Sequence, residues 1–342
     1  MADVDPEAFA WLGGRLAVGC VDITDDPAAL DSQGFWAVVA TFEGALTFAR
    51  FANVRAAPLP SAGAPWPALD GPWRTSLDRV AYVAACAEVR ERVARGTVYQ
   101  VNVCRVLEHD LPAGADTVAL AHRLASGNPA PYAGLIHLPS RGVEVVTASP
   151  ELFLGRRGDR IESSPIKGTA ATAAGLLAKD RDENVMIVDL VRNDLSRVCE
   201  PGSVEVPSLL RLEAHPGLVH LVSTVSGRLR TDAGWPELFA AAFPPGSVSG
   251  APKSTALQAI WDLEPTPRGP YCGAVGWVDA DRVEAELAVG IRTFWVDREG
   301  APVLRFGTGA GITWGSEPEL EWEETELKAA RLVSLASGKV VA

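Results

Sequence analysis

The strand-rich block at residues 271–313 decides the fold class. It holds three runs that are apolar or alternate apolar with polar residues, GAVGWVDA (273–280), VEAELAVGIRTFWVD (283–297) and PVLRFGTGAGIT (302–313). Such runs, separated by turn residues, predict β-strands that follow one another in antiparallel pairs. We therefore expect antiparallel sheet here, with Arg292 inside a strand and a glycine-rich turn at Gly307, Gly309 and Gly311.

The same pattern recurs toward the N-terminus. FWAVVATF and ALTFARF flank Glu43-Gly44, which predicts a β-hairpin, and residues 132–168 hold four more predicted strands with a turn at Gly158-Asp159. The strand blocks alternate with predicted helices rather than with single βαβ units, so the fold class is α+β. The helices are predicted at residues 76–96, 115–128 and 173–196, and after a capping box formed by Ser316 and Glu319.

Composition narrows the classes of function. The net charge of −12 disfavours nucleic-acid and anionic-membrane partners, because both require concentrated Lys and Arg. The five cysteines are widely spaced and form no CxxC pair, which predicts free thiols rather than a disulfide framework or a zinc site. The N-terminal residues are acidic where a signal peptide needs positive charge, and no run approaches the ~18–20 apolar residues of a membrane span. We expect a soluble cytoplasmic protein.

Two predicted helices each carry a pair of carboxylates three residues apart on one face. These pairs are Asp180 and Glu183 in KDRDENVMIVDLVRND (179–194), and Glu321 and Glu324 in SEPELEWEETELKAARL (316–332). Lys328 follows Glu324 by one helical turn. If the two faces meet, they form an oxygen-rich site of the kind that Mg²⁺ prefers. Taken alone, the spacing favours two solvated helix faces with routine ion pairs.

One lysine stands out in SPIKGTA (164–170). Lys167 lies between Pro165, which fixes φ, and Gly168, which is conformationally free, at the end of an apolar strand. It is either a surface lysine with its chain along the protein or a partly buried amine that can act as a nucleophile. Taken alone, its position favours the surface lysine.

Two further segments can bind an anion. The loop FPPGSVSGAPKSTALQAI (243–260) runs into a helix near Pro252, whose free N–H groups favour a carboxylate; a simple N-cap turn is the alternative. The GxxxxGK[ST] nucleotide pattern fails there. Arg292 precedes the glycine-rich segment and could hold a carboxylate with two hydrogen bonds, or pair with a structural acid. His220 lies in an apolar run, where a lone His is more often a core residue.

Taken together, these segments resemble the chorismate-utilising enzymes, a family that includes anthranilate synthase component I, aminodeoxychorismate synthase component I, isochorismate synthase and salicylate synthase. The resemblance covers about residues 76–335. It rests on motifs in family order: SPELFL, PIKGT, ENVMIVDLVRNDLSRV, HLVSTVSG, FPPGSVSGAPKSTAL, YCGAVGW, GIRTF, GAGI and EWEETELKA. Lys167 in PIKGT is similar to the lysine of the aminodeoxychorismate branch, where anthranilate synthases have a small residue. Gln100 stands where isochorismate and salicylate synthases have a lysine that activates water.

The resemblance implies an aminodeoxychorismate synthase component I, which aminates chorismate at C4 for p-aminobenzoate and folate synthesis. Lys167 would add at C2 while Glu151, in SPELFL, protonates the departing 4-hydroxyl. Glu183 and Glu324 would ligate Mg²⁺, with Asp180 and Glu321 close by through waters. The implied substrate-binding residues are Arg292, Tyr271, Gly309 and Gly311 around the pyruvyl carboxylate, His220 near the ring carboxylate, Lys253 and Lys328 as balancing charges, and Thr169 and Gln100.

The resemblance also implies the architecture and the partners. The expected fold is a two-subdomain α/β sandwich with central antiparallel sheets and outer helices, in which residues 1–74 are integrated with a chorismate-binding catalytic domain at 75–338. Ammonia would come from a separate glutamine amidotransferase subunit. Anthranilate synthase component I is the alternative enzyme. A weakly active chorismate-binding subunit of an amidotransferase complex is the second alternative, because the segment after Thr169 is shorter and richer in Ala than the GTRPR stretch of the family.

Overall fold

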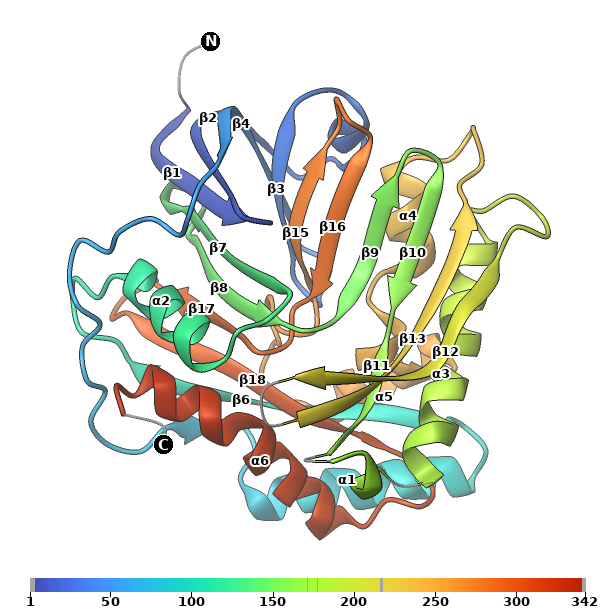
Figure 1. The fold of residues 1–342 in the computed structure, drawn as a ribbon. Helices are drawn as coiled ribbons and strands as arrows, with labels where there is room; N and C mark the ends of the chain where they lie inside the picture. The colour runs from blue at the N-terminus through green and yellow to red at the C-terminus, as the bar shows by residue number, and fades with distance from the viewer. Residues whose placement is uncertain (1–3, 171, 177, 216–217, 340–342) are drawn as a thin grey trace.

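The computed structural model describes residues 4–170, 172–176, 178–215 and 218–339, with strands at the centre and helices outside (Figure 1). The strands are β1 (Asp5–Leu12), β2 (Arg15–Thr24), β3 (Phe35–Ala40), β4 (Leu46–Ala56), β5 (Arg74–Thr75), β6 (Gln100–Asp110), β7 (Tyr132–Leu138), β8 (Val143–Ser149), β9 (Leu152–Arg157), β10 (Arg160–Ser164), β11 (Ile166–Ala170), β12 (Glu205–His215), β13 (Leu218–Arg228), β14 (Gly250–Ala251), β15 (Ala274–Asp279), β16 (Glu284–Val289), β17 (Thr293–Asp297) and β18 (Val303–Ile312). The α-helices are α1 (Arg79–Ala94), α2 (Thr117–Gly127), α3 (Ala178–Ser196), α4 (Trp235–Ala242), α5 (Lys253–Leu263) and α6 (Pro318–Ala336).

The strands form one continuous antiparallel sheet. From β12 the hydrogen-bonded order runs through β13, β10, β9, β16, β15, β3, β4, β2, β1, β7, β8, β17, β18 and β6. Strand β11 adds to β13, and the short β5 and β14 add to β6. Every pairing between named strands in the described residues is antiparallel. The predicted α+β class, with central antiparallel sheets, is confirmed.

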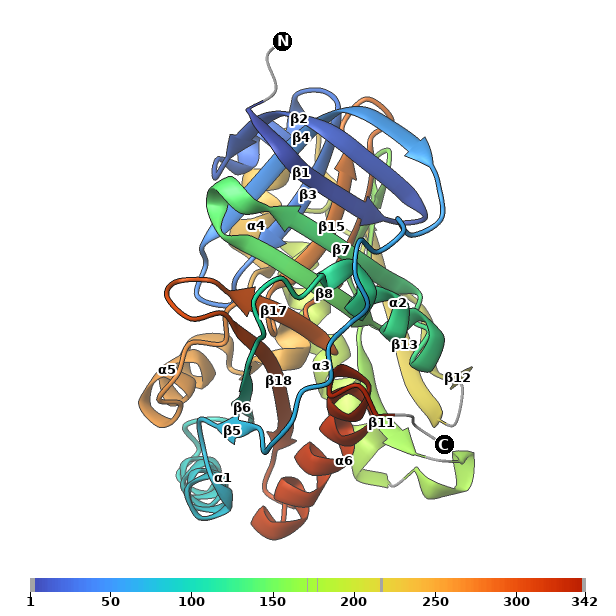
Figure 2. The same cartoon turned by 90° about the vertical axis from the view of Figure 1, so that its left-hand side faces the viewer.

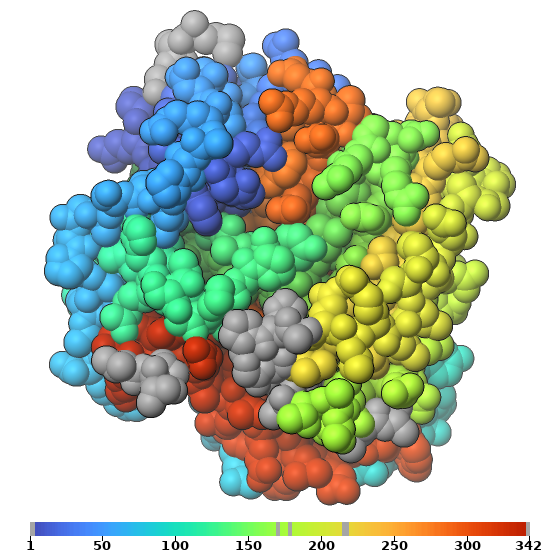
Figure 3. Space-filling model, viewed as in Figure 1, coloured from blue at the N-terminus to red at the C-terminus, as the bar shows by residue number. Residues whose placement is uncertain are grey.

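The helices lie on the outside of this sheet. Helices α1 and α6 pack against each other, with α6 on β18, while α3 lies against β13 (Figures 1 and 2). In the space-filling view, side chains fill most of the space between the ribbons (Figure 3). None of the helices described is long and apolar enough to cross a membrane. All five cysteines are buried free thiols, as the sequence predicted.

The N-terminal strands share a core with the rest of the chain. All six residues of β3 and all six of β15 are buried, and the two strands pair along their whole length. A strand that is covered on both faces consists mostly of apolar residues without alternation. This explains the composition of FWAVVA in β3 and AVGWVD in β15. One hydrophobic cluster therefore runs from Ala8 to Ile312. The boundary between residues 1–74 and 75–338 stays a prediction.

Several predicted helix ends and hairpin turns are confirmed by the structure. Helix α1 begins after Asp78, whose side chain accepts a hydrogen bond from the Ala81 N–H, and it ends before Gly96, which has a φ of 74°. Strands β3 and β4 form the predicted hairpin around Glu43-Gly44, and β9 and β10 form the one around Gly158. Helix α5 begins directly after Pro252.

Two predictions in the block at 271–313 are wrong. The run 283–297 is two strands, and Arg292 lies between them with a φ of 51°. A Cβ on Gly290 would lie 2.0 Å from the carbonyl oxygen of Pro270, so the chain passes close to that loop and turns away from the sheet. The glycine-rich segment is not a turn but the second half of β18. Glycine at every second position from 307 to 311 leaves one face of this half of the strand without side chains.

Two predicted helix starts are also wrong. The helix predicted at residues 173–196 begins at Ala178, after a single 3-10 turn at Ala173–Gly175. Ser316 and Glu319 do not form a capping box. The N-cap of α6 is Glu317, because Pro318 occupies the first helical position, and Ser316 Oγ accepts instead from the Thr313 N–H. Glu319 pairs with Arg79 of α1.

Candidate active site

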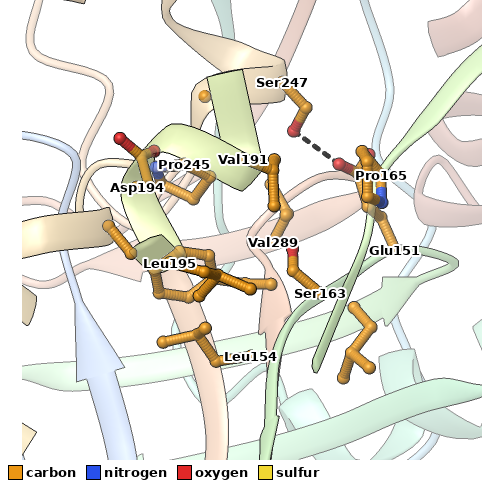
Figure 4. Close-up of a pocket in the computed structure, with 14 residues that line it drawn as sticks. Glu151, Leu154, Ser163, Pro165, Val191, Asp194, Leu195, Pro245, Ser247 and Val289 are labelled. Atoms are coloured by element: carbon orange, nitrogen blue, oxygen red, sulfur yellow. Dashed lines mark hydrogen bonds between the residues drawn. The ribbon is translucent and has the colours of Figure 1, made fainter. Parts of the chain in front are cut away.

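Glu151 is the carboxyl group at the centre of the site. It lies in the two-residue connection between β8 and β9, with 3% of its surface exposed. Its Oε1 accepts a hydrogen bond of 2.5 Å from Ser247 Oγ (Figure 4), and the backbone N–H of Ile166 also donates to the carboxyl. Burial raises the pKa of Glu151 to about 7, against the opposing effects of Ser247 and the positive charge of Lys167. A carboxyl with this pKa can hold a proton and release it near neutral pH, as a general acid must.

Lys167 lies beside Glu151 and the glycine-rich half of β18. A Cβ on Gly311 would lie 3.4 Å from Lys167 Nζ and 2.3 Å from Gln100 Nε2. The missing side chain at Gly311 therefore lets the amine and the amide approach the strand. Gln100 is 1% exposed, and its Oε1 has no hydrogen-bond partner among the described residues. An amine, a carboxyl and an amide thus lie close together, while the roles of Lys167 as nucleophile and Glu151 as general acid stay predictions.

The other two glycines make room for buried side chains. A Cβ on Gly309 would lie 2.6 Å from Cys104 Sγ, and one on Gly307 would lie 2.1 Å from Tyr271 Cγ. The Tyr271 ring thus packs against β18, and its hydroxyl accepts a long hydrogen bond of 3.7 Å from the Cys104 thiol. Burial raises the pKa of Tyr271 well above its usual value, so the phenol stays protonated.

Arg292 is a half-buried cation that has no carboxylate partner within the described residues. Its Nη2 lies 3.3 Å from Nε2 of His220, a side chain that is 1% exposed, and desolvation lowers the pKa of Arg292. The pairing of β17 with β18 ends at Phe294 and Phe306, so the β18 backbone beyond Phe306 does not pair with β17. A partly desolvated guanidinium without a carboxylate partner is suited to a carboxylate ligand.

Carboxylates of both α3 and α6 act on one ammonium group, that of Lys328. Lys328 Nζ lies 2.6 Å from Glu324 Oε1 and donates to the carbonyl of Gly309 at 3.0 Å. Desolvation acts to lower the pKa of Lys328, but the carboxylates of Glu324, Glu321 and Glu183 outweigh it and raise the pKa. Glu183 comes from α3 and the other two from α6, so carboxylates of both predicted helices act on the same ammonium group, and the metal site itself stays a prediction.

These carboxylates fit Mg²⁺ in the type of ligand. Mg²⁺ is commonly held by one or two protein carboxylates, with water and substrate oxygens completing its shell. Among the described residues, no group of three or more His, Cys, Asp or Glu is placed so that it could hold a metal ion. Asp180 lies at the start of α3, where its Cβ is 2.8 Å from the point that a Cβ on Gly168 would occupy. The acidic helix α3 therefore packs directly against β11 at Gly168, the residue after Lys167.

Two predicted binding residues lie in different surroundings. Lys253 Nζ is 2.7 Å from Asp194 Oδ2 and donates to the Ala242 carbonyl at 3.0 Å, so its charge is balanced by Asp194 rather than by Glu183 or Glu324. The backbone of Thr169 pairs with that of His220, but the Thr169 side chain lies outside the described part of the chain. Sequence reasoning missed Ser247, which is one of several small residues in the loop at 243–260.

Comparison with known proteins identifies a family. Residues 42–334 match the family described as chorismate binding enzyme. The chain is 42% identical over 276 residues to an aminodeoxychorismate synthase of Streptomyces pristinaespiralis, a match that covers 77% of this chain and 37% of that protein. It is 38% identical over 274 residues to an anthranilate synthase component 1 of Haloarcula marismortui, covering 77% of this chain and 54% of that protein.

A third relative is an aminodeoxychorismate synthase component 1 of Klebsiella aerogenes, 35% identical over 278 residues that cover 78% of this chain and 60% of that protein. The chain thus spans from 37% to 60% of the length of these three relatives. Among solved structures, a putative 2,3-dihydroxybenzoate-specific isochorismate synthase from Bacillus anthracis superposes with a TM-score of 0.81 at 24% identity, over 97% of each chain. Anthranilate synthase component I from Streptococcus pneumoniae gives 0.77 at 20% identity, over 97% of this chain and 91% of that one. At these identities the structural likeness concerns the fold.

Proposed function

The chain belongs to the chorismate-binding enzymes, and on that premise we propose that it aminates chorismate at C4 to give 4-amino-4-deoxychorismate. The observation that carries this proposal is the placement of Lys167 beside the protonatable carboxyl of Glu151, next to the bare backbone of Gly311. An amine and an acid that act on one ring are what substitution at C4 through a covalent intermediate requires.

The first step is displacement of the 4-hydroxyl. The chorismate ring is a conjugated diene, so a bond formed at C2 can push electrons through both double bonds and break the C4–O bond. The neutral amine of Lys167 forms the new bond to C2, and Glu151 gives its proton to the leaving oxygen, which departs as water. Glu151 is left as a carboxylate, which the nearby Lys167 and Ser247 stabilise.

The second step is attack by ammonia at C4. The electrons return through the ring, the C4–N bond forms and the C2–Nζ bond breaks, which frees Lys167 as an amine. The proton lost by the incoming ammonia restores the acid form of Glu151. A glutamine amidotransferase subunit would supply the ammonia and serve as the partner of this chain.

The remaining residues hold the substrate in place. Arg292 is the candidate partner of the pyruvyl carboxylate, because its guanidinium is desolvated and has no carboxylate partner among the described residues. Its Nη2 lies 3.3 Å from His220 Nε2, and the β18 backbone at Gly309 and Gly311 would complete the carboxylate site. Buried charges need a partner, and a substrate carboxylate supplies one.

Mg²⁺ would be held by Glu183 and Glu324, with Asp180 and Glu321 acting through water. When bound, it supplies positive charge that draws electron density toward the ring carboxylate. The effect of carboxylates from both α3 and α6 on the pKa of Lys328 supports this assignment. Lys328 would keep the carboxylates together and balance part of their charge.

Anthranilate synthase component I is the second candidate, since relatives with that name match almost as well, at 38% and 40% identity. That enzyme places nitrogen at C2 and eliminates pyruvate, whereas Lys167 occupies the space beside C2 in the present proposal. Incubation of the chain with chorismate, Mg²⁺ and ammonium, followed by mass analysis, separates them. Aminodeoxychorismate without pyruvate supports the proposal, anthranilate with stoichiometric pyruvate supports the second candidate, and unchanged chorismate supports a binding subunit.

A further inference from the structure

Ser247 makes a short contact with Glu151 that the chemistry above does not yet explain. It lies on a single 3-10 turn, Gly246–Val248, in the loop between α4 and α5. The side chain is buried, with 5% of the residue exposed, and its Oγ donates to Glu151 Oε1 at 2.5 Å (Figure 4). This is the single side-chain hydrogen bond to the Glu151 carboxyl within the described residues.

The loop holds Ser247 independently of Glu151. Ser249 Oγ donates to the Pro245 carbonyl at 3.0 Å, and the Val248 carbonyl accepts from Arg268 Nη1 at 2.9 Å. A Cβ on Gly246 would lie 2.7 Å from the Leu190 side chain, so the turn packs closely on α3. These contacts hold the turn that carries Ser247, and none of them involves the Glu151 carboxyl.

We propose that Ser247 is a positioning residue that orients Glu151 for proton transfer to the leaving 4-hydroxyl of the substrate. Because Oε1 accepts from Ser247, the transferable proton is placed on Oε2. When that proton leaves with the substrate oxygen, Ser247 keeps its own proton and donates to the carboxylate that forms. This inference rests on the proposed function only for the identity of the proton acceptor.

Other charged and titratable groups face Glu151 and set the background for a test. Lys167 from β11 and Lys328 from α6 both favour its carboxylate form. The Tyr132 phenol of β7 also interacts with Glu151, and burial raises the pKa of Tyr132 to about 12, so it stays neutral across the working range. Asp194 of α3 lines the small cavity behind Glu151, where Lys253 of α5 balances its charge. None of these groups is changed when Ser247 is replaced.

The first test is the pH profile of the purified chain with chorismate, Mg²⁺ and ammonium. Ser247→Ala should lower kcat by about tenfold to a hundredfold, the usual effect of losing a hydrogen bond to a charged group. It should also move the alkaline limb of kcat to higher pH, because the lost donor stabilised the carboxylate, and it should leave KM for chorismate nearly unchanged. Ser247→Thr should restore the wild-type limb.

Ser249→Ala is the matched control, since it removes a buried hydroxyl from the same loop without touching Glu151. It should leave the alkaline limb in place. If both alanine variants lower kcat with no shift of the limb, Ser247 has only a structural role in the loop and the inference is wrong.

A spectroscopic titration tests the contact without turnover. The protonated Glu151 carboxyl gives an infrared C=O band, identified by its loss in Glu151→Gln, and this band should persist to higher pH in Ser247→Ala than in wild type. If the wild-type chain leaves chorismate unchanged but the band still shifts in Ser247→Ala, the proposed function is overturned and the positioning role is supported. Identical titration of the band in both proteins overturns the positioning role, whatever the reaction.

Discussion

Replacing Glu151 with Gln should abolish amination at C4 and make the folded protein more stable at alkaline pH. Gln keeps the shape of the protonated side chain, and its carbonyl oxygen can still accept from Ser247. It has no acidic proton, so the 4-hydroxyl leaves without assistance. The stability effect follows because Gln also has no charge to bury.

The size and sign of that effect follow from the raised pKa. Burial holds the pKa of Glu151 at about 7 in the folded chain, against 4.5 without it, so the folded state binds the proton more tightly than the unfolded state. The cost of ionising Glu151 is absent below pH 4.5, grows between pH 4.5 and 7, and is fully present above pH 7. At ~1.4 kcal/mol per pKa unit, it amounts to about 3 kcal/mol at pH 8 and less than about 1 kcal/mol at pH 5.

Urea unfolding of both proteins at pH 5 and pH 8 measures the difference. Glu151→Gln should gain up to about 3 kcal/mol over wild type at pH 8 and much less at pH 5. Glu144→Gln is the matched control, because Glu144 is also buried but is paired with Arg298, 2.6 Å away. Its replacement should lower stability at pH 8. A Glu151→Gln variant that gains nothing between pH 5 and 8 would refute the argument that Glu151 is an ionisable group held against desolvation.

Further substitutions probe the rest of the site. Lys167→Ala should reduce aminodeoxychorismate formation by orders of magnitude, because each ~1.4 kcal/mol added to the barrier lowers the rate tenfold. The affinity for chorismate, measured by calorimetry, should change little. A near-normal rate would show that Lys167 only lines the pocket. Glu183→Gln and Glu324→Gln should each abolish Mg²⁺-dependent turnover and weaken Mg²⁺ binding with little loss of folding stability; wild-type activity of both at limiting Mg²⁺ would show other ligands. Arg292→Lys should raise KM for chorismate about tenfold or more, because an ammonium cannot form the two parallel hydrogen bonds; an unchanged KM would place the carboxylate elsewhere.

The sequence predicted the chemical groups of the site better than their surroundings. Lys167, Glu151 and the two carboxylate helices were found because ordered motifs placed them together. Their spacing alone could not show that carboxylates of α3 and α6 act on the same lysine, since that depends on where each helix packs on the sheet. The same limit applies to Lys253, whose partner Asp194 comes from another helix.

The errors have local physical causes. The glycines at 307, 309 and 311 occur at every second position, which is the period of a strand, and the expectation of a turn overlooked it. The break at Arg292 comes from the close approach of Gly290 to Pro270, a contact between segments about twenty residues apart that a periodic pattern does not reveal. Ser247 and Ser249 are equivalent as sequence, and only the 3-10 turn directs the first of them to Glu151.

The central claim is that Lys167 forms a bond to the substrate, and peptide mass analysis of the quenched protein tests it most directly. The chain is incubated with chorismate and Mg²⁺ without ammonia, quenched in acid and digested. We expect a mass increase equal to chorismate minus water, located on the peptide that contains Lys167 and absent from Lys167→Ala. An unmodified Lys167 in a wild-type chain that makes aminodeoxychorismate once ammonium is added would contradict the account.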